Sequence, residues 1–275
     1  MIELQNVAFG YRKKNPLFSD LSLNLERGHV YGLLGSNGVG KTTLLKLVCG
    51  LLFPQQGRIE VMGRCPAQRS PSLYRDLFVI PEEFDMPPIR FGTFADTTGA
   101  LYPAFSRRML DDYCREFGID PEIKLNAVSM GQKKKALIAF ALACNVRLLV
   151  MDEPTNGLDI PAKATFRRLV SSFASEDRTV IISSHQVRDL SMLIDSVVIL
   201  DTGGVLLNMT VERISEKFCF GSLGDDDDPV YREESLSGYI GVTENRSGRE
   251  SSVDLELLFN ATVRNRDRVR TIVNR

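Results

Sequence analysis

The stretch that decides the fold runs from Val30 to Val48 and reads VYGLLGSNGVGKTTLLKLV. The run from His29 to Leu34 is short and almost entirely apolar, which predicts a buried strand. A glycine-rich turn follows, and the pattern from Thr42 to Val48 predicts a helix. A strand, a turn and a helix in this order open an α/β fold.

The turn carries a phosphate-binding motif. Residues 35–42 fit the pattern G-x-x-x-x-G-K-[ST] between a strand and a helix, which is the context that this motif requires. Glycines let the backbone turn its amides inward, and the N-terminus of the helix adds a positive dipole. Lys41 is therefore expected to reach the β- and γ-phosphates of a nucleotide, and the Thr42 hydroxyl to bind Mg²⁺. The nucleotide-binding residues predicted here are Ser36, Asn37, Gly38, Val39, Gly40, Lys41, Thr42 and Thr43.

Two carboxylates follow a second apolar run. Residues 148–151 predict a buried strand that ends in Asp152 and Glu153. A nucleotide site needs an acid near Mg²⁺, which Asp152 can supply, and Glu153 can polarise a water molecule for attack on the γ-phosphate. Taken alone, such a pair is more often a helix cap or a surface turn. The phosphate-binding motif upstream favours the catalytic interpretation.

Further apolar runs predict strands at residues 77–80, 180–183 and 196–200. Helical spacing separates the later strands, so we predict a doubly wound parallel sheet with its ligand at the carboxyl ends of the strands. A shorter helical pattern is formed by Val187, Leu190 and Leu193. From about residue 87 to 146 helical spacing dominates, which predicts a helical subdomain inserted into the α/β core.

The composition changes after Gly203-Gly204. The acidic run 225–228 and recurring Ser, Gly and Asn predict a linker or a turn-rich small subdomain. Ser251 and Ser252 are candidate caps for a last helix, and the arginine-rich tail is expected to be a solvated end. We therefore divide the chain into an ATP-binding domain of residues 1–215 and a C-terminal appendage of residues 216–275, which we expect to be regulatory or dimer-stabilising.

The composition excludes several classes of protein. Lys and Arg total 34 against 35 Asp and Glu, so the formal charge of −1 draws the chain neither to nucleic acid nor to lipid. The five cysteines show no C-x-x-C spacing, which is typical of reduced thiols in a cytosol. No apolar window reaches the roughly 18 residues of a membrane span, and the N-terminus does not resemble a signal peptide. Any role at a membrane therefore requires a partner.

These segments together resemble the ATP-binding cassette (ABC) family of ATPases over residues 1–215. Residues 128–132, Val-Ser-Met-Gly-Gln, are similar to the family signature L-S-G-G-Q. Ser129 precedes a helix-compatible run, so a hydroxyl and free amides are available to an anion. The resemblance implies that Ser129, Gly131 and Gln132 bind the γ-phosphate of a nucleotide held by a second subunit, and hence a homodimer or pseudo-dimer. It also implies a P-loop NTPase core with a parallel sheet, an N-terminal antiparallel β part, the helical subdomain and a small C-terminal α/β appendage.

The resemblance assigns four more residues. Tyr11 occupies the position of the aromatic residue that stacks on adenine. Asp159 occupies the position of the residue that communicates across the dimer, and His185 occupies the position of the switch histidine that contacts the γ-phosphate. Taken alone, a Tyr or a His at such a place is more often structural. Glu82 stands where the family has a glutamine that meets Mg²⁺ and the transport partner, and Met130 replaces the first signature glycine. Glu82 can still accept a water ligand of Mg²⁺, but it adds a negative charge, so coupling or nucleotide release can differ.

Three functions are compared. The first is an ATP-hydrolysing subunit that is bound to the inner face of the cell membrane through separate transmembrane permease subunits. Its docking surface for the permease would lie near Glu82 and would include Phe84, Met86 and Phe91, unless these are core residues. The second is a soluble ABC ATPase of a cytosolic assembly or repair complex. The third, a kinase-like P-loop enzyme, would leave the signature, Asp159 and His185 unexplained. We rank them in this order, and the transported substrate and its direction are not encoded in this chain.

Overall fold

The computed structural model describes residues 1–12, 15–224, 226–236 and 238–275. Its centre is a six-stranded sheet in the order β5-β6-β7-β3-β8-β9. All neighbouring strands are parallel except β9, which pairs with β8 as an antiparallel hairpin. The predicted parallel sheet is thereby confirmed. Its strands are β3 (Val30–Leu34), β5 (Leu77–Ile80), β6 (Leu148–Asp152), β7 (Thr179–Ser184), β8 (Ser196–Asp201) and β9 (Gly204–Thr210).

The two faces of this sheet pack against different layers, because successive side chains of a strand point to opposite faces. In β3, Val30 and Leu34 face one hydrophobic cluster, whereas Tyr31 and Leu33 face the other. The second cluster is shared with helix α1 and with a small antiparallel sheet in the order β2-β1-β4. These elements are β1 (Ile2–Phe9), β2 (Phe18–Leu25), α1 (Lys41–Val48) and β4 (Gln56–Val61), followed by η1 (Pro66–Gln68) and α2 (Pro71–Tyr74).

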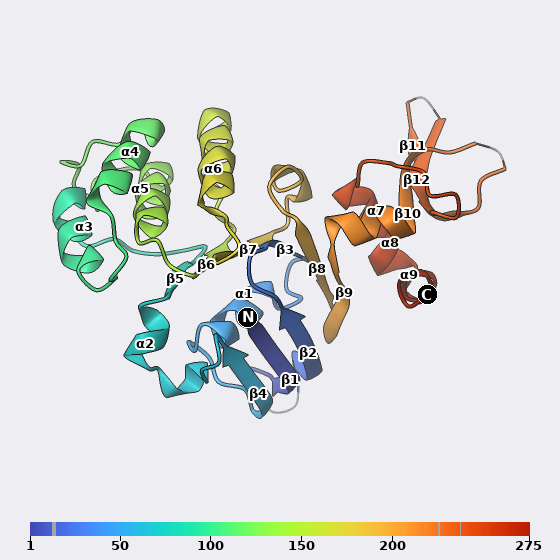
Figure 1. Ribbon diagram of the computed structural model, residues 1–275, viewed down its shortest axis with the longest axis horizontal. Helices are drawn as coiled ribbons and strands as arrows, with labels where there is room; N and C mark the ends of the chain where they lie inside the picture. The colour runs from blue at the N-terminus through green and yellow to red at the C-terminus, as the bar shows by residue number, and fades with distance from the viewer. Residues whose placement is uncertain (13–14, 225, 237) are drawn as a thin grey trace.

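The chain between β5 and β6 is helical, as expected, and its helices group at one side of the molecule (Figure 1). They are α3 (Phe91–Gly99), α4 (Arg107–Phe117) and α5 (Met130–Ala143), and α6 (Ile160–Phe173) follows β6. Phe91 is fully buried and is a core residue rather than part of a docking surface. Phe84 and Met86 pack against the core and are only partly buried. The pattern at Val187, Leu190 and Leu193 yields only the 3-10 turn η2 (Val187–Asp189).

The C-terminal part is more regular than its composition indicates. Three short strands form an antiparallel sheet in the order β10-β12-β11, opposite the helical insert in Figure 1. Of the two predicted alternatives, a linker or a turn-rich small subdomain, the structure shows the small subdomain. Its strands were not predicted, because alternation in such short, half-exposed strands is too weak to mark them. Of the predicted acidic loop, Asp225 lies outside the described residues. The elements are α7 (Val211–Lys217), β10 (Phe218–Ser222), β11 (Pro229–Ser235), β12 (Gly238–Glu244), α8 (Leu255–Arg264) and α9 (Arg266–Val273).

One prediction for the tail is wrong. Helix α8 is capped by Asp254, whose carboxylate accepts from the N–H groups of Glu256 and Leu257, and not by Ser251 or Ser252. Most arginines of the tail are exposed, as expected, but the segment forms α9 and three of its arginines make ion pairs. The pairs are Arg266 with Asp201, Arg268 with Asp228 and Arg275 with Glu244.

None of the helices in the described part of the chain is long and apolar enough to cross a membrane.

Candidate functional site

The phosphate loop connects β3 to α1. Gly38 and Gly40 have φ values of 83° and 108°, a region that favours glycine, and a Cβ at Gly40 would lie 2.6 Å from Cζ of Phe18. No side chain caps α1, so its first N–H groups are available to an anion. Lys41 is buried, and its Nζ donates to the carbonyls of Gly35 at 2.7 Å and Ser36 at 3.3 Å. The lysine thus closes the loop on itself and is placed to exchange these carbonyls for phosphate oxygens.

The two predicted carboxylates lie at the carboxyl end of β6, and both are only 5% exposed. The Ser183 hydroxyl, on the neighbouring strand β7, donates to Asp152. Glu153 adopts a φ of 47°, which is uncommon for a residue with a Cβ. Its N–H donates to the carbonyl and to Oγ of Ser183, at 3.2 and 3.1 Å. Ser183 therefore positions both acids, and sequence reasoning missed it.

Glu153 and His185 form a pair. Oε1 of Glu153 accepts from the backbone N–H of His185 at 2.9 Å and lies 2.8 Å from its Nδ1. Oε2 is buried and has no hydrogen-bond partner among the residues that the structure describes. One carboxylate oxygen is thus held in place, and the other is free to accept a hydrogen bond.

A cavity of about 580 Å³ collects most of the predicted site. Tyr11 lines this cavity and is 65% exposed as a residue. Its ring packs edge-on against Phe9, and its hydroxyl lies 3.0 Å from Oγ1 of Thr43. Val39 is buried under the loop, so only its backbone can contact a ligand. The predicted residues that line this cavity are Tyr11, Asn37, Gly38, Gly40, Lys41, Thr42, Thr43, Glu82, Asp152, Glu153 and His185.

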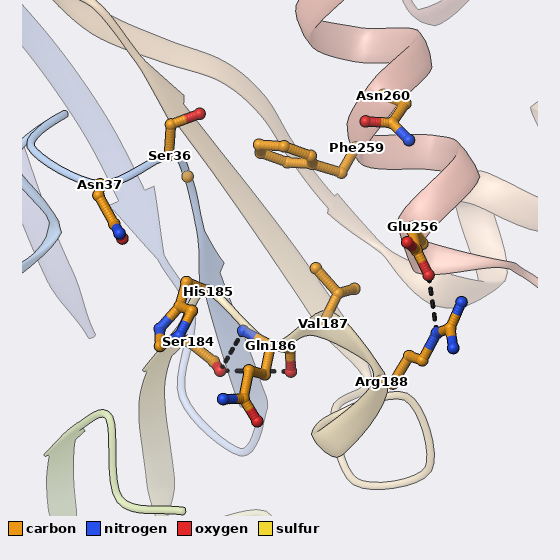
Figure 2. Close-up of a pocket in the computed structure, with 11 residues that line it drawn as sticks. Ser36, Asn37, Ser184, His185, Gln186, Val187, Arg188, Glu256, Phe259 and Asn260 are labelled. Atoms are coloured by element: carbon orange, nitrogen blue, oxygen red, sulfur yellow. Dashed lines mark hydrogen bonds and ion pairs between the residues drawn. The ribbon is translucent and has the colours of Figure 1, made fainter. Parts of the chain in front are cut away.

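Ser36 faces a second cavity, of about 600 Å³, beside the phosphate loop. Figure 2 shows that its walls come from three places: the loop, the segment after β7, and helix α8. Phe259 reaches from α8 toward Ser36, and Glu256 forms an ion pair of 2.8 Å with Arg188. The C-terminal appendage thus reaches the nucleotide-binding end of the sheet, which no sequence pattern indicated.

Charges of both signs meet at the main cavity. Burial lowers the pKa of Lys41, and the carboxylates of Glu153, Asp152 and Glu82 oppose that shift. The net effect is a lowered pKa of Lys41, because burial outweighs the attraction of the three carboxylates. A bound triphosphate would add further negative charge and favour the protonated form.

The signature residues do not line the main cavity. Ser129 lies at the start of helix α5, as the sequence predicts, and forms a capping box with Gln132 that was not predicted. A Cβ at Gly131 would lie 2.8 Å from the carbonyl oxygen of Gly157, so helix and loop meet closely there. Asp159 caps α6 through the N–H of Ala162 and pairs with Lys135 at 3.2 Å, and the cap and this pair lower its pKa. Ser129, Gly131 and Gln132 therefore lie outside the main cavity of their own chain.

Comparison with known proteins identifies the family. The sequence model of the ABC transporter family matches residues 18–156. The chain belongs to the ABC transporter family. This ABC ATPase is 30% identical to the ABC transporter ATP-binding protein NatA of Bacillus subtilis in an alignment of 204 positions that covers 72% of this chain and 83% of NatA. It is 29% identical to the lantibiotic transport ATP-binding protein SrtF of Streptococcus pyogenes, over 75% of this chain and 90% of SrtF.

Solved structures share the ABC fold. An ATP-binding subunit of an ABC transporter superimposes with a TM-score of 0.72 at 25% identity and covers 78% of this chain and 91% of that one. An ATP-binding cassette solved as a dimer with ADP and Pi has a TM-score of 0.67 at 21% identity, over 76% and 98% of the two chains. The chain is thus an ATP-binding ATPase with the P-loop fold, and the kinase-like alternative has no support.

Proposed function

We propose that this ABC ATPase hydrolyses ATP in the cavity of about 580 Å³ and powers transport through separate membrane subunits. The observation that carries the catalytic part is the state of Glu153, whose Oε1 is held by His185 while the buried Oε2 has no partner among the described residues. An acceptor held in this way can bind and orient a water molecule. That the relatives in the comparison are transport proteins supports the coupling to transport.

The nucleotide contacts follow from the chain's own groups. Backbone amides at the start of α1 cradle the phosphates, and Lys41 turns from its own loop carbonyls to the β- and γ-phosphates. Tyr11 offers an exposed ring for the adenine. In the catalytic step, the water oxygen bonds to the γ-phosphorus, the bond to the β–γ bridging oxygen breaks, and Oε2 of Glu153 accepts the proton. His185 keeps Glu153 in the orientation that this transfer needs.

The donor set fits Mg²⁺. Thr42, Glu82 and Asp152 line the main cavity and also an adjoining one of about 300 Å³. They offer a hydroxyl and carboxylate oxygens, which are the hard ligands that this ion prefers beside nucleotide phosphates. Within the described residues there is no cluster of three or more His, Cys, Asp and Glu side chains that could hold a metal, in keeping with an ion bound largely by phosphates and water. When bound, Mg²⁺ would neutralise charge on the β- and γ-phosphates.

A second copy would complete the site. Ser129, Gly131 and Gln132 do not line the cavity of their own chain, so the signature is available to the nucleotide of another cassette. We infer a homodimer or pseudo-dimer with two shared sites, closed by ATP and opened after hydrolysis. The exposed carboxylate of Glu82 and the partly buried Phe84 and Met86 form the surface that would meet the permease.

The test uses tagged Glu153→Gln in native membranes, extracted in mild detergent with ATP and Mg²⁺. This variant is expected to bind ATP, to lose hydrolysis by about 100-fold or more, and to elute as a dimer. A stoichiometric membrane-spanning protein should co-purify with it. Unchanged hydrolysis would remove Glu153 from its catalytic role. Co-purification of a soluble assembly without any membrane protein would favour the alternative of a cytosolic ABC ATPase.

A further inference from the structure

The signature helix carries a buried cation that sequence reasoning did not single out. Lys133, Lys134 and Lys135 are consecutive, and only Lys134 points inward, where it is 2% exposed. Its Nζ donates to the backbone carbonyls of Glu153 and Asn156, each at 3.0 Å. An ammonium buried in this way clamps the turn that follows the catalytic carboxylate.

The same turn makes a longer, exposed contact with Glu82. The Asn156 amide Nδ2 donates to Oε1 of Glu82 at 3.5 Å. Burial lowers the pKa of Lys134, and of the three carboxylates that oppose this shift Glu82 has the largest effect. Glu82, Asn156 and Lys134 thus form one connected network between the permease-facing loop and α5.

The network supports a strained backbone. Glu153 has a φ of 47°, a conformation that is unfavourable for a residue with a Cβ and persists only where the surroundings hold it. Ser183 binds the N–H of Glu153, and Lys134 binds its carbonyl. Both ends of this residue's backbone are therefore tied down.

Lys134 also offsets part of the negative charge around the cavity. The cavity region contains the carboxylates of Glu82, Asp152 and Glu153, against the buried ammonium groups of Lys41 and Lys134. Without Lys134 the acids would exceed the lysines by two before any triphosphate arrives. The added carboxylate at Glu82 is therefore tolerated beside a buried cation.

We propose that Lys134 and Glu82 together position Glu153 for hydrolysis: Lys134 holds the backbone of the turn directly, and Glu82 contacts the same turn through Asn156. Lys134 is a positioning residue, since it contacts the backbone of Glu153 and not the reacting atoms. The inference rests on the proposed role of Glu153 and adds a second pair of residues to it.

The test is a double-mutant cycle of Lys134→Gln and Glu82→Gln, measured as kcat, KM and binding of a fluorescent ATP analogue with Mg²⁺. Each single change is expected to lower kcat by about fivefold or more with binding within about threefold, because it shifts the net charge around Glu153 by one and replaces a charged partner of the turn. The double variant should recover at least about fivefold relative to the product of the single effects. Lys133→Gln removes the same charge from the neighbouring position and should leave kcat unchanged.

Additive losses in this cycle would overturn the proposal, and so would equal losses in kcat and in binding. If Lys134→Gln does not fold, Glu82→Gln and Asn156→Ala are used for the test instead, because both residues are more exposed than Lys134. Because Glu82 reaches the turn through Asn156, their double variant should be no slower than the slower single variant, and a multiplied loss would contradict this. If Glu153→Gln hydrolyses ATP normally, the proposed function itself is wrong. If Glu153→Gln is inactive but the effects in the cycle are additive, only the joint positioning by Lys134 and Glu82 is wrong.

Discussion

At the scale of single residues, the site depends on partners that carry no motif. Ser183 donates its hydroxyl proton to Asp152 and accepts the backbone N–H of Glu153, so one small side chain orders both acids. Its only mark in the sequence is its place at the end of an apolar run. Residues of this kind change an activity by about 10- to 100-fold without touching the substrate.

We predict that Ser183→Ala lowers ATP hydrolysis by about tenfold or more. It should also lower the free energy of unfolding by about 1–3 kcal/mol, because buried polar groups lose their partner. Steady-state hydrolysis and urea denaturation measure the two effects. Ser172→Ala, on the exposed face of α6, is the control and should change neither quantity. Normal hydrolysis by Ser183→Ala would show that the two acids are held in place without it.

At the scale of elements, the signature helix and the loop after β6 act as one unit. A Cβ at Gly131 would lie only 2.8 Å from the carbonyl oxygen of Gly157. Lys135 forms an ion pair with Asp159, the residue that caps α6. Helix α5 is therefore in direct contact with the loop that leads to α6 at two places. Such a connection would let a signature segment that binds nucleotide in a second copy also report on its own Glu153.

The close approach at Gly131 gives a test at this scale. Gly131→Ala is expected to lower the free energy of unfolding by about 1–3 kcal/mol, because its Cβ would meet backbone at 2.8 Å and the helix must shift. Gly204→Ala is the matched control: its Cβ would have no neighbour within 4 Å among the described residues. Its effect should stay within about 0.5 kcal/mol. Equal unfolding midpoints in urea for the two variants would show that the helix and the loop are not tightly packed.

At the scale of the whole molecule, the C-terminal appendage is joined to the catalytic core. Leu255, Leu257, Leu258 and Ala261 of α8 belong to the hydrophobic cluster that also contains the β8 residue Ile199. The proposed boundary between residues 215 and 216 falls inside α7, and the regulatory or dimer-stabilising role of the appendage stays a prediction. Because α8 also walls the cavity beside Ser36, a change in its packing would reach the phosphate loop (Figure 2).

We predict that Leu258→Ala, at a fully buried position, lowers the free energy of unfolding by about 2–5 kcal/mol in a single cooperative transition. The physical reason is the loss of contacts in a cluster that the appendage shares with the main sheet. Leu236→Ala, at a fully exposed position, should be neutral. A separate early transition that leaves ATP binding intact would instead identify the appendage as an independent unit.

What the sequence by itself determined are the features encoded by neighbouring residues. The phosphate loop, the buried strand that ends at the two proposed catalytic acids and the helical insert all follow from runs and motifs that are local in the chain, because hydrophobic periodicity and turn chemistry act over a few residues. The same locality explains the correct position of Ser129 as a helix cap.

What only the tertiary structure decided are the contacts between segments far apart in the chain. Three features depend on how strands and helices are placed in space. They are the burial of Lys134 but not of its two neighbouring lysines, the contacts of Ser183 with both acids, and the position of α8 beside the phosphate loop. The Asp254 cap and the ion pairs of the tail belong here as well, because several nearby residues could serve and packing selects among them. Side-chain partners across the fold carry no periodic signal, so composition and spacing do not reveal them.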